Sequence, residues 1–276
     1  MPPAFITLTT DFGLTDPYVA SMKGAIYTIN PEATIVDISH DIAAHRIEQA
    51  TFVLGCAAPY FPKGSIHVAV VDPDVGTDRR ALAIVTEDDI YVGPDNGVLS
   101  CALPDGAREA AGNTTGTVRL PKGMRAFELT KSRFHRTRVS ATFHGRDVFA
   151  PVAARLSLGV SLSELGPETG EIVAFRPIRG EDAEGGGLRG HVVHIDRFGN
   201  AVTSIRGDQL PSPELTVEAA GRSIGGVLQT YADAEGFLAL VGSCGFLEIA
   251  LNGGHAAGEL GVKLGDSVMI RASSRV

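Results

Sequence analysis

The chain has 276 residues, a formal net charge of −8 and 44% hydrophobic residues, enough for one large core or for a major domain and a smaller one. No leader-like start or bilayer-length apolar run occurs, so we expect a cytoplasmic protein without a membrane partner. The acidic balance and the lack of a Lys/Arg block give no electrostatic reason to bind nucleic acid. Cys56, Cys101 and Cys244 form no CxxC pair, which argues against disulfides and a cysteine zinc site.

The first 165 residues alternate between strand-like and helix-like segments. Strands are expected at 4–9, 33–39, 65–72, 81–86 and 89–93, and helices after Pro17, over 46–61 and over 148–159. This order predicts an N-terminal α/β domain with a mostly parallel sheet flanked by helices. Ligands of such sheets collect at the carboxyl ends of the strands.

The second half differs from the first in composition and in its pattern of apolar residues. Residues 166–188 are rich in Gly, Pro and charge, which is typical of a linker. Residues 189–276 carry short β-like runs separated by turn residues, which predict a small C-terminal antiparallel β-barrel domain. The expected division is therefore 1–165, 166–188 and 189–276.

Polar residues gather in loops at the strand ends. These loops are TDFG (10–13), DISHD (37–41), VDPDVGTDRR (71–80), GPDNG (93–97), TFHGRD (142–147), IDRFGN (195–200) and GSCG (242–245). Any one of them alone is more typical of a turn. Their number, together with Arg79 and His144, favours a functional site. For His40, Asp41 and Asp95 we expect solvated or turn-forming roles.

Signatures of bound cofactors are missing from the sequence. There is no phosphate-binding loop, and the one GxGxxG, at 185–190, precedes a strand and does not join a strand to a helix. No HExxH or His pair at helical spacing occurs. We therefore expect neither a cofactor nor a metal.

Taken together, these loops resemble the S-adenosyl-L-methionine (SAM) hydrolases that form adenosine, also called hydroxide adenosyltransferases, which are relatives of the fluorinating and chlorinating enzymes. The similarity runs in the same order from TDFGLTDPYV to SCGFLEIALNGGHAA. It implies an N-terminal α/β domain, a small β-barrel domain and a homotrimer. It also implies that the nucleoside substrate binds between the N-terminal domain of one subunit and the C-terminal domain of a neighbour.

The resemblance assigns residues to roles. The water-positioning Asp, Arg and His of the family correspond to Asp72 (VVDP), Arg79 (TDRR) and His144 (FHGRD). Further residues are implied to bind the substrate. They are Asp11 for the ribose hydroxyls, Asp16 near the methionine end, Asp196 and Ser243 for the amino-acid moiety, Asn200 for the adenine, and Gly253, whose backbone faces the base.

Several positions separate the branches of the family. The halogenating enzymes replace the aspartate at Asp72 by Tyr and the His144-Gly145 pair by Tyr-Ser, so this chain follows the hydrolases. The chain also has only Glu87 and Asp88 where the fluorinating form has a long insertion. Three departures from the family pattern bear on substrate affinity. They are Asp74 for a glycine, where we expect a differently bent or left-handed backbone, His45 for an aromatic residue, and Cys244 beside the serine.

The implied reaction is hydrolysis of SAM to adenosine and L-methionine by attack of water or hydroxide on the ribose C5′. The sulfonium is a good leaving group, so the protein must supply an oxygen nucleophile in line with the C5′–S bond. Asp72 can accept a proton, while His144 can orient the water or share the proton, and the sequence leaves open whether the triad deprotonates water or selects hydroxide.

The same residues also suit different roles. Asp72 and Arg79 can form a simple strand-end ion pair, and His144 can cap the following helix. The many strand-end Asp, Asn and His residues are equally typical of a metal-dependent nucleotide or phosphoester hydrolase. A non-catalytic trimer that binds SAM or adenosine, and a halogenating enzyme, are further alternatives.

Overall fold

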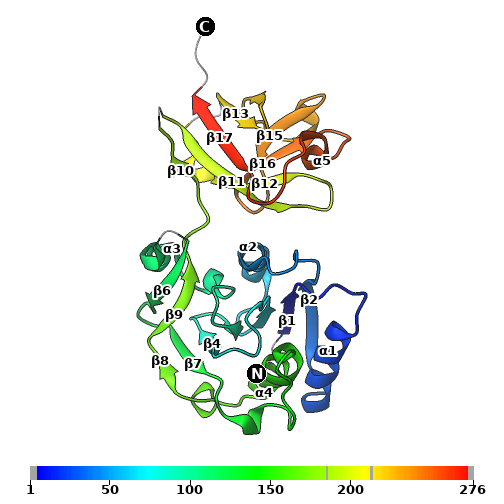
Figure 1. Ribbon diagram of the computed structural model, residues 1–276, viewed down its shortest axis with the longest axis vertical. Helices are drawn as coiled ribbons and strands as arrows, with labels where there is room; N and C mark the ends of the chain where they lie inside the picture. Colours follow the sequence, from blue (N-terminus) through cyan, green and yellow to red (C-terminus); the bar gives the residue numbers. More distant parts are fainter. Residues whose placement is uncertain (1–4, 113, 185, 212–213, 273–276) are drawn as a thin grey trace. The chain divides into compact units, whose positions relative to one another are not determined.

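Two large sheets of different kinds, and one small two-stranded sheet, organise the described residues (Figure 1). The computed structural model describes residues 5–112, 114–184, 186–211 and 214–272. The chain divides into an N-terminal unit, Met1–Pro177, and a C-terminal unit, Ile178–Val276. The expected fold class, an α/β domain followed by an antiparallel barrel, is confirmed.

The N-terminal sheet has the order β2-β1-β3-β5-β4-β7-β8. It is parallel across β2, β1, β3 and β5 and antiparallel from β5 through β4 and β7 to β8. Only residues 86–89 separate β4 from β5, and a connection this short permits only an antiparallel pair. The strands are β1 Phe5–Thr10, β2 Thr34–Ser39, β3 Ile66–Val70, β4 Ala81–Val85, β5 Ile90–Pro94, β7 Arg125–Glu128 and β8 Glu168–Thr169, while β6 Thr115–Arg119 pairs with β9 Glu171–Phe175 in a second, small sheet.

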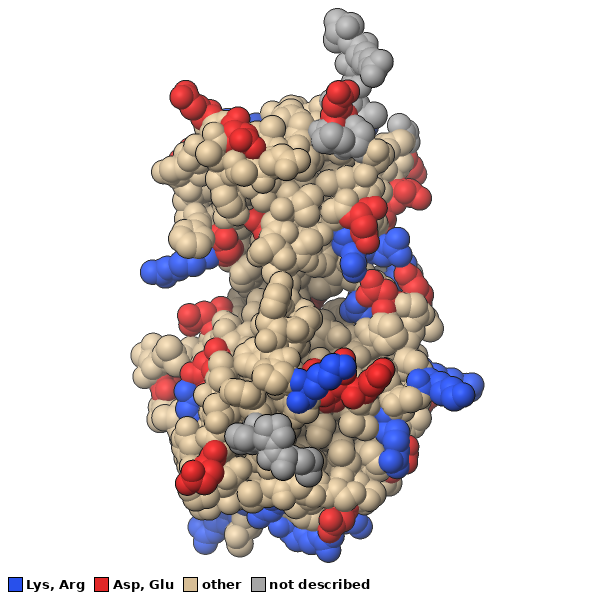
Figure 2. Space-filling model, turned by 180° about the vertical axis from the view of Figure 1, so that it is seen from behind, with Lys and Arg blue, Asp and Glu red and all other residues tan. Residues whose placement is uncertain are grey.

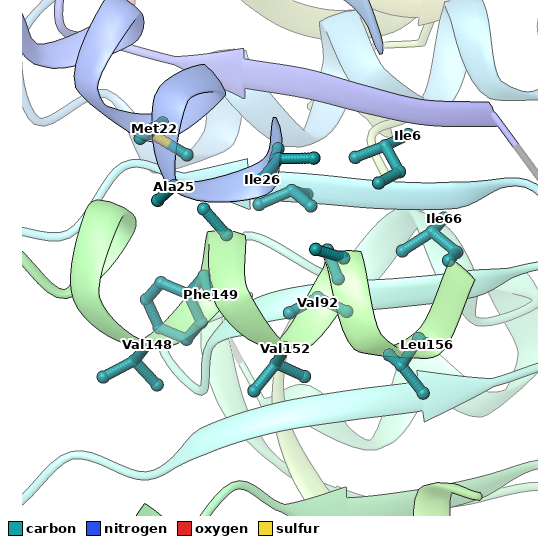
Figure 3. Close-up of a cluster of buried hydrophobic side chains, with 14 of the residues drawn as sticks. Ile6, Met22, Ala25, Ile26, Ile66, Val92, Val148, Phe149, Val152 and Leu156 are labelled. Carbon is teal, nitrogen blue, oxygen red and sulfur yellow. The ribbon is translucent and has the colours of Figure 1, made fainter. Parts of the chain in front are cut away.

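Apolar side chains cover both faces of the N-terminal sheet. Successive residues of a strand point to opposite faces, so Val68 and Val70 enter one core while Ala69 and Val71 enter the other. Helices α1 Tyr18–Ile29 and α4 Ala150–Ser157 cover the first face, and α2 Ile47–Ala57 covers the second. Figure 3 shows α1 lying along α4, with Met22 and Ile26 directed into this core.

Smaller elements complete the N-terminal unit. A π-helical turn, Gly145–Phe149, leads directly into α4, and the short helix α3 spans Asp105–Arg108. None of the described helices is long and apolar enough to cross a membrane.

The C-terminal unit is an antiparallel sheet with the order β14-β13-β17-β11-β12-β16-β15, in which β10 also pairs with β11. Its two edge strands, β14 and β15, lie near each other, so the sheet is almost closed into a barrel. Val192, Ile205 and Ile249 belong to its buried core. The elements are β10 Glu181–Asp182, β11 Leu188–Ile195, β12 Ala201–Arg206, β13 Leu215–Ala219, β14 Arg222–Gly225, β15 Phe237–Val241, β16 Phe246–Leu251, α5 Ala256–Leu260 and β17 Ser267–Ala272.

The expected linker, 166–188, contains three short strands, β8, β9 and β10. Strands β8 and β9 pair within the N-terminal unit, and β10 pairs within the C-terminal unit, so the division between the units falls after Pro177. Alternate residues of β9, Ile172 and Ala174, are buried against the core that α2 covers. The Gly-rich and charged flanks conceal this two-residue period in the sequence. Gly185, the first glycine of the GxGxxG, lies outside the described residues.

Candidate active site

The three residues expected to position water lie in direct contact. Asp72 follows β3, Arg79 precedes β4, and His144 precedes the π-helical turn. The Nε of Arg79 donates to both carboxylate oxygens of Asp72 at 3.0 and 3.1 Å, and its Nη2 is 2.7 Å from His144 Nδ1. The side chains of Arg79 and Asp72 are only 8% and 4% exposed. One guanidinium therefore joins the carboxylate to the imidazole in a largely buried cluster.

This contact fixes the hydrogen-bonding state of His144. A guanidinium can only donate hydrogen bonds, so Arg79 Nη2 donates to the Nδ1 lone pair and the neutral ring carries its hydrogen on Nε2. Burial, together with the charge of Arg79, lowers the pKa of His144 below its ordinary value of 6.5. The imidazole is thus neutral near pH 7 and presents an N–H donor. Although His144 stands at the N-cap position of the π-helical turn, its side chain makes no capping hydrogen bond.

A glycine holds the two loops of this cluster together. Gly76 has a φ of 83°, and a Cβ there would lie 2.3 Å from the carbonyl oxygen of Ala141. Only a residue without a side chain allows the loop that carries Asp72 and Arg79 to pack this closely on the segment before His144.

An aromatic cluster holds the TDFG loop, residues 10–13, close to His144. The rings of Phe12 and Tyr18 make edge contacts with Phe143, with centroids 5.7 and 5.2 Å apart. Phe12 follows Asp11 and Phe143 precedes His144, so the TDFG loop lies beside the FHGRD loop. Asp11 is half-buried and accepts a hydrogen bond from the backbone N–H of His45 at 2.9 Å. Asp16 is exposed.

The remaining predicted residues line one pocket of the C-terminal unit. Asp196, Asn200, Ser243 and Gly253 all contribute to this pocket, whose volume is about 910 Å³. Asp196 accepts hydrogen bonds from the backbone and the side-chain amide of Asn200, at 2.8 and 2.9 Å. The two side chains thus fix each other at the pocket wall. The structure describes these four residues in a different unit from Asp11, Asp72, Arg79 and His144.

The pocket also contains a carboxylate that was not predicted from the sequence. Glu248 is 8% exposed and accepts a hydrogen bond from the Tyr231 hydroxyl at 3.2 Å. Burial, with a further contribution from the charge of Asp196, raises the pKa of Glu248. A Cβ on Gly242 would lie 1.7 Å from a carboxylate oxygen of Glu248, so Gly242 makes room for that side chain. The signal in the sequence was a charged residue inside the apolar run FLEIAL.

The expectation of a solvated side chain is wrong for His40 and for Asp95. His40 is buried and contacts the Thr10 hydroxyl at 2.8 Å, and buried Asp95 accepts hydrogen bonds from Arg80 and the backbone of Val173. Both hold strands and loops together and are not solvated. Asp74 does not use the left-handed region, because the described non-glycine residues with positive φ are His45 and Ala220.

No group of three or more His, Cys, Asp or Glu in the described part of the chain is arranged to hold a metal ion. A cavity of about 360 Å³ opens beside Arg79 and His144, and His135 and Glu128 also line it. This cavity can therefore offer the imidazole donor of His144 and the carboxylate of Glu128 to a small polar molecule next to the fixed positive charge of Arg79.

Known proteins match the chain over nearly its whole length. The profile of the SAM hydroxide adenosyltransferase N-terminal domain matches residues 6–166, and that of the C-terminal domain matches residues 190–269. An (R)-S-adenosyl-L-methionine hydrolase of Salinispora arenicola is 39% identical over 97% of this chain and 98% of its own. A fluorinase of Actinopolyspora mzabensis is 27% identical, covering 97% of each chain. The crystal structure of an uncharacterized conserved protein from Thermotoga maritima matches 96% of this chain and 99% of its own, at 34% identity and a TM-score of 0.82.

Proposed function

The chain belongs to the SAM hydroxide adenosyltransferase family, and from this premise we propose that it hydrolyses S-adenosyl-L-methionine to adenosine and L-methionine. The observation that carries the proposal is the contact of Asp72, Arg79 and His144 in one buried cluster. The more similar relative is named a hydrolase and the more distant one a fluorinase, which favours water over halide as the nucleophile.

In the proposed reaction the oxygen of water forms a bond to C5′ while the C5′–S bond breaks. The electron pair of that bond leaves on sulfur, which turns the sulfonium of SAM into the thioether of methionine. Asp72 accepts the proton of the attacking water, because the neutral His144 presents a donor and not an acceptor. The Nε2–H of His144 orients the water oxygen. Arg79 holds both groups in place through its hydrogen bonds to Asp72 and His144.

Substrate recognition is divided between the units in this proposal. Asp11 binds the ribose hydroxyls and Asp16 lies near the methionine end. In the C-terminal pocket, Asp196 and Ser243 bind the amino-acid moiety, and Asn200 and the backbone of Gly253 read the adenine. Such contacts, made far from C5′, hold the reacting atoms in line.

We further propose a cytoplasmic homotrimer that needs neither metal nor cofactor and has no nucleic-acid or membrane partner. Each site would combine the N-terminal unit of one subunit with the C-terminal unit of another. A mixing experiment tests this arrangement. Asp72→Asn, which should lose turnover, and Asp196→Ala, which should bind SAM weakly, are dissociated and reassembled together. Activity at a low SAM concentration should return, because some mixed sites then contain no substitution. Failure to regain activity in a mixed trimer verified by mass would contradict shared sites.

The reaction itself is tested by incubating purified protein with SAM in ¹⁸O-labelled water. We expect ¹⁸O in the 5′-hydroxyl of adenosine, detected by mass spectrometry. An EDTA-treated sample should retain its rate, whereas a metal-dependent hydrolase would lose it. A sample with chloride or fluoride should form no halogenated adenosine. Binding of SAM without turnover would leave only the non-catalytic alternative and refute the proposal.

A further inference from the structure

A second cavity of the N-terminal unit is lined by arginines. It has a volume of about 750 Å³, and α1, the segment 135–138 and the region of α4 form its walls. Four arginines line it, Arg136, Arg138, Arg146 and Arg155, together with His135 and Ser21. Figure 2 shows Lys and Arg side chains gathered at the lower end of the N-terminal unit, the end at which Figure 1 places α4. We call this space the arginine cavity.

The positive charges of the arginine cavity are poorly balanced. Among the described residues, no Asp or Glu lines it. The nearby carboxylate of Asp147 already accepts two hydrogen bonds from Arg146, at 2.7 and 2.8 Å, and one from the backbone of Ser140, while Arg136 lies 3.8 Å away. Arg155 bonds only weakly to the carbonyl of Pro151, at 3.4 Å, and Arg138 has no acidic partner in the part of the chain that the structure describes. Of the four guanidiniums, only those of Arg136 and Arg146 therefore lie near a carboxylate, and both use Asp147.

Such an arrangement attracts anions. Like charges around a cavity repel one another, and the repulsion is relieved when a counter-charge enters. It also contrasts with the chain as a whole, whose net charge is −8. Planar guanidinium forks match the oxygen atoms of phosphoryl groups and bind them through paired hydrogen bonds. The volume is that of a small-molecule site and exceeds what one orthophosphate fills.

We propose that the arginine cavity binds a small anion carrying two or more phosphoryl groups in a chain. The site is distinct from the proposed SAM site. It shares only His135 with the cavity beside Arg79 and His144, and it shares no residue with the pocket of the C-terminal unit. The proposal does not depend on the reaction that the protein catalyses. The sequence conceals the cavity because one wall is α1 and the other lies in residues 135–155, which are far from α1 along the chain.

Calorimetric titration of the intact protein tests the proposal. Inorganic triphosphate, ATP and orthophosphate are added at constant ionic strength, with adenosine present to occupy the proposed substrate site. We expect saturable binding of one triphosphate per chain, at least about tenfold tighter than orthophosphate because more guanidiniums are engaged. If ATP binds no more tightly than triphosphate, the phosphoryl chain is the recognised group. If ATP binds more tightly than triphosphate, the natural ligand is a nucleotide.

Matched variants locate the binding. Arg138→Ser and Arg155→Gln should each weaken triphosphate at least about tenfold, because each removes a guanidinium without an acidic partner among the described residues. The control is Arg133→Ser, which removes an equal charge from the same loop. Arg133 pairs with Glu164 at 3.4 Å and does not line the cavity, so its loss should leave the affinity unchanged. Absence of saturable binding, or equal weakening in all three variants, would overturn the proposal. So would dissociation of an oligomer by Arg138→Ser without anion binding, because the cavity would then be an interface between copies.

Discussion

The triad of the N-terminal unit and the pocket of the C-terminal unit differ in construction. In the triad, charged side chains bind one another and are largely withdrawn from solvent. In the pocket, polar and apolar side chains together surround an open space of about 910 Å³. A preformed charge cluster acts on the transition state, whereas a shaped cavity acts on substrate and transition state alike. The comparison predicts that changes in the triad lower kcat and changes in the pocket raise KM.

A large loss of kcat is expected for Arg79→Met. This change removes the group that joins Asp72 to His144 and leaves a buried carboxylate without its partner. We expect kcat to fall by about a thousandfold, measured by adenosine release. Arg80→Met is the control, because Arg80 pairs with Asp95 and Glu128 and touches neither Asp72 nor His144. An equal loss in both variants would mean that Arg79 acts only through stability.

Asn200→Ala tests the pocket. It removes a side chain that lines the cavity and hydrogen-bonds to Asp196. We expect KM to rise by about 10- to 100-fold, the usual cost of one lost polar contact, with kcat changed less than about threefold. A fall in kcat with an unchanged KM would contradict the division of labour between the two regions.

Gly76→Ala should loosen the triad through the backbone. The substitution combines a positive φ with a Cβ that would lie 2.3 Å from a carbonyl oxygen, so we expect a loss of about 2–3 kcal/mol in the free energy of unfolding. Gly64→Ala is matched, because its φ is 87° and no atom lies within 4 Å of its Cβ. That control should cost only about 1 kcal/mol in urea unfolding. Equal costs would show that the contact with Ala141 is unimportant.

The smallest effect is expected for the dependence of kcat and stability on pH. The pKa of His144 lies below 6.5, so kcat should be flat from pH 8 to 6.5 and decline below that range, where a protonated Nδ1 can no longer accept from Arg79. The unfolded chain binds the proton more readily, so stability is also lost as the pH falls below 6.5. A decline of kcat centred above pH 7 in the pH profile would contradict a neutral His144.

Local patterns predicted much of the N-terminal unit. Apolar periods identified β1, β2, β3, α1 and α2, and a resemblance placed Asp72, Arg79 and His144 in one site, where the structure brings them together. The antiparallel direction of β4 relative to β5 could have been predicted, because the short 86–89 connection excludes a parallel pair. Strands β6, β7 and β9 were missed, because they are short and stabilised by partners distant in sequence.

The buried polar residues were the least predictable. His40 and Asp95 stand in sequences typical of turns, and only the tertiary structure shows that Thr10 and Arg80 are their partners. The buried position of Glu248 requires the space beside Gly242, which has no side chain. The arginine cavity requires segments that are far apart in the chain. In each case the deciding contact joins residues that are distant in sequence. Local secondary-structure propensity and hydrophobic periodicity therefore cannot predict it.

The most direct test of the proposed chemistry compares binding and turnover in Asp72→Asn. Asparagine keeps the size of the side chain but cannot serve as the proton acceptor, while the C-terminal pocket is untouched. Calorimetry should give a Kd for SAM within about threefold of the unmodified protein, and a single-turnover assay should give a rate reduced by at least about a thousandfold. A variant that still converts SAM to adenosine at an appreciable rate would contradict the role of Asp72 as the acceptor of the water proton.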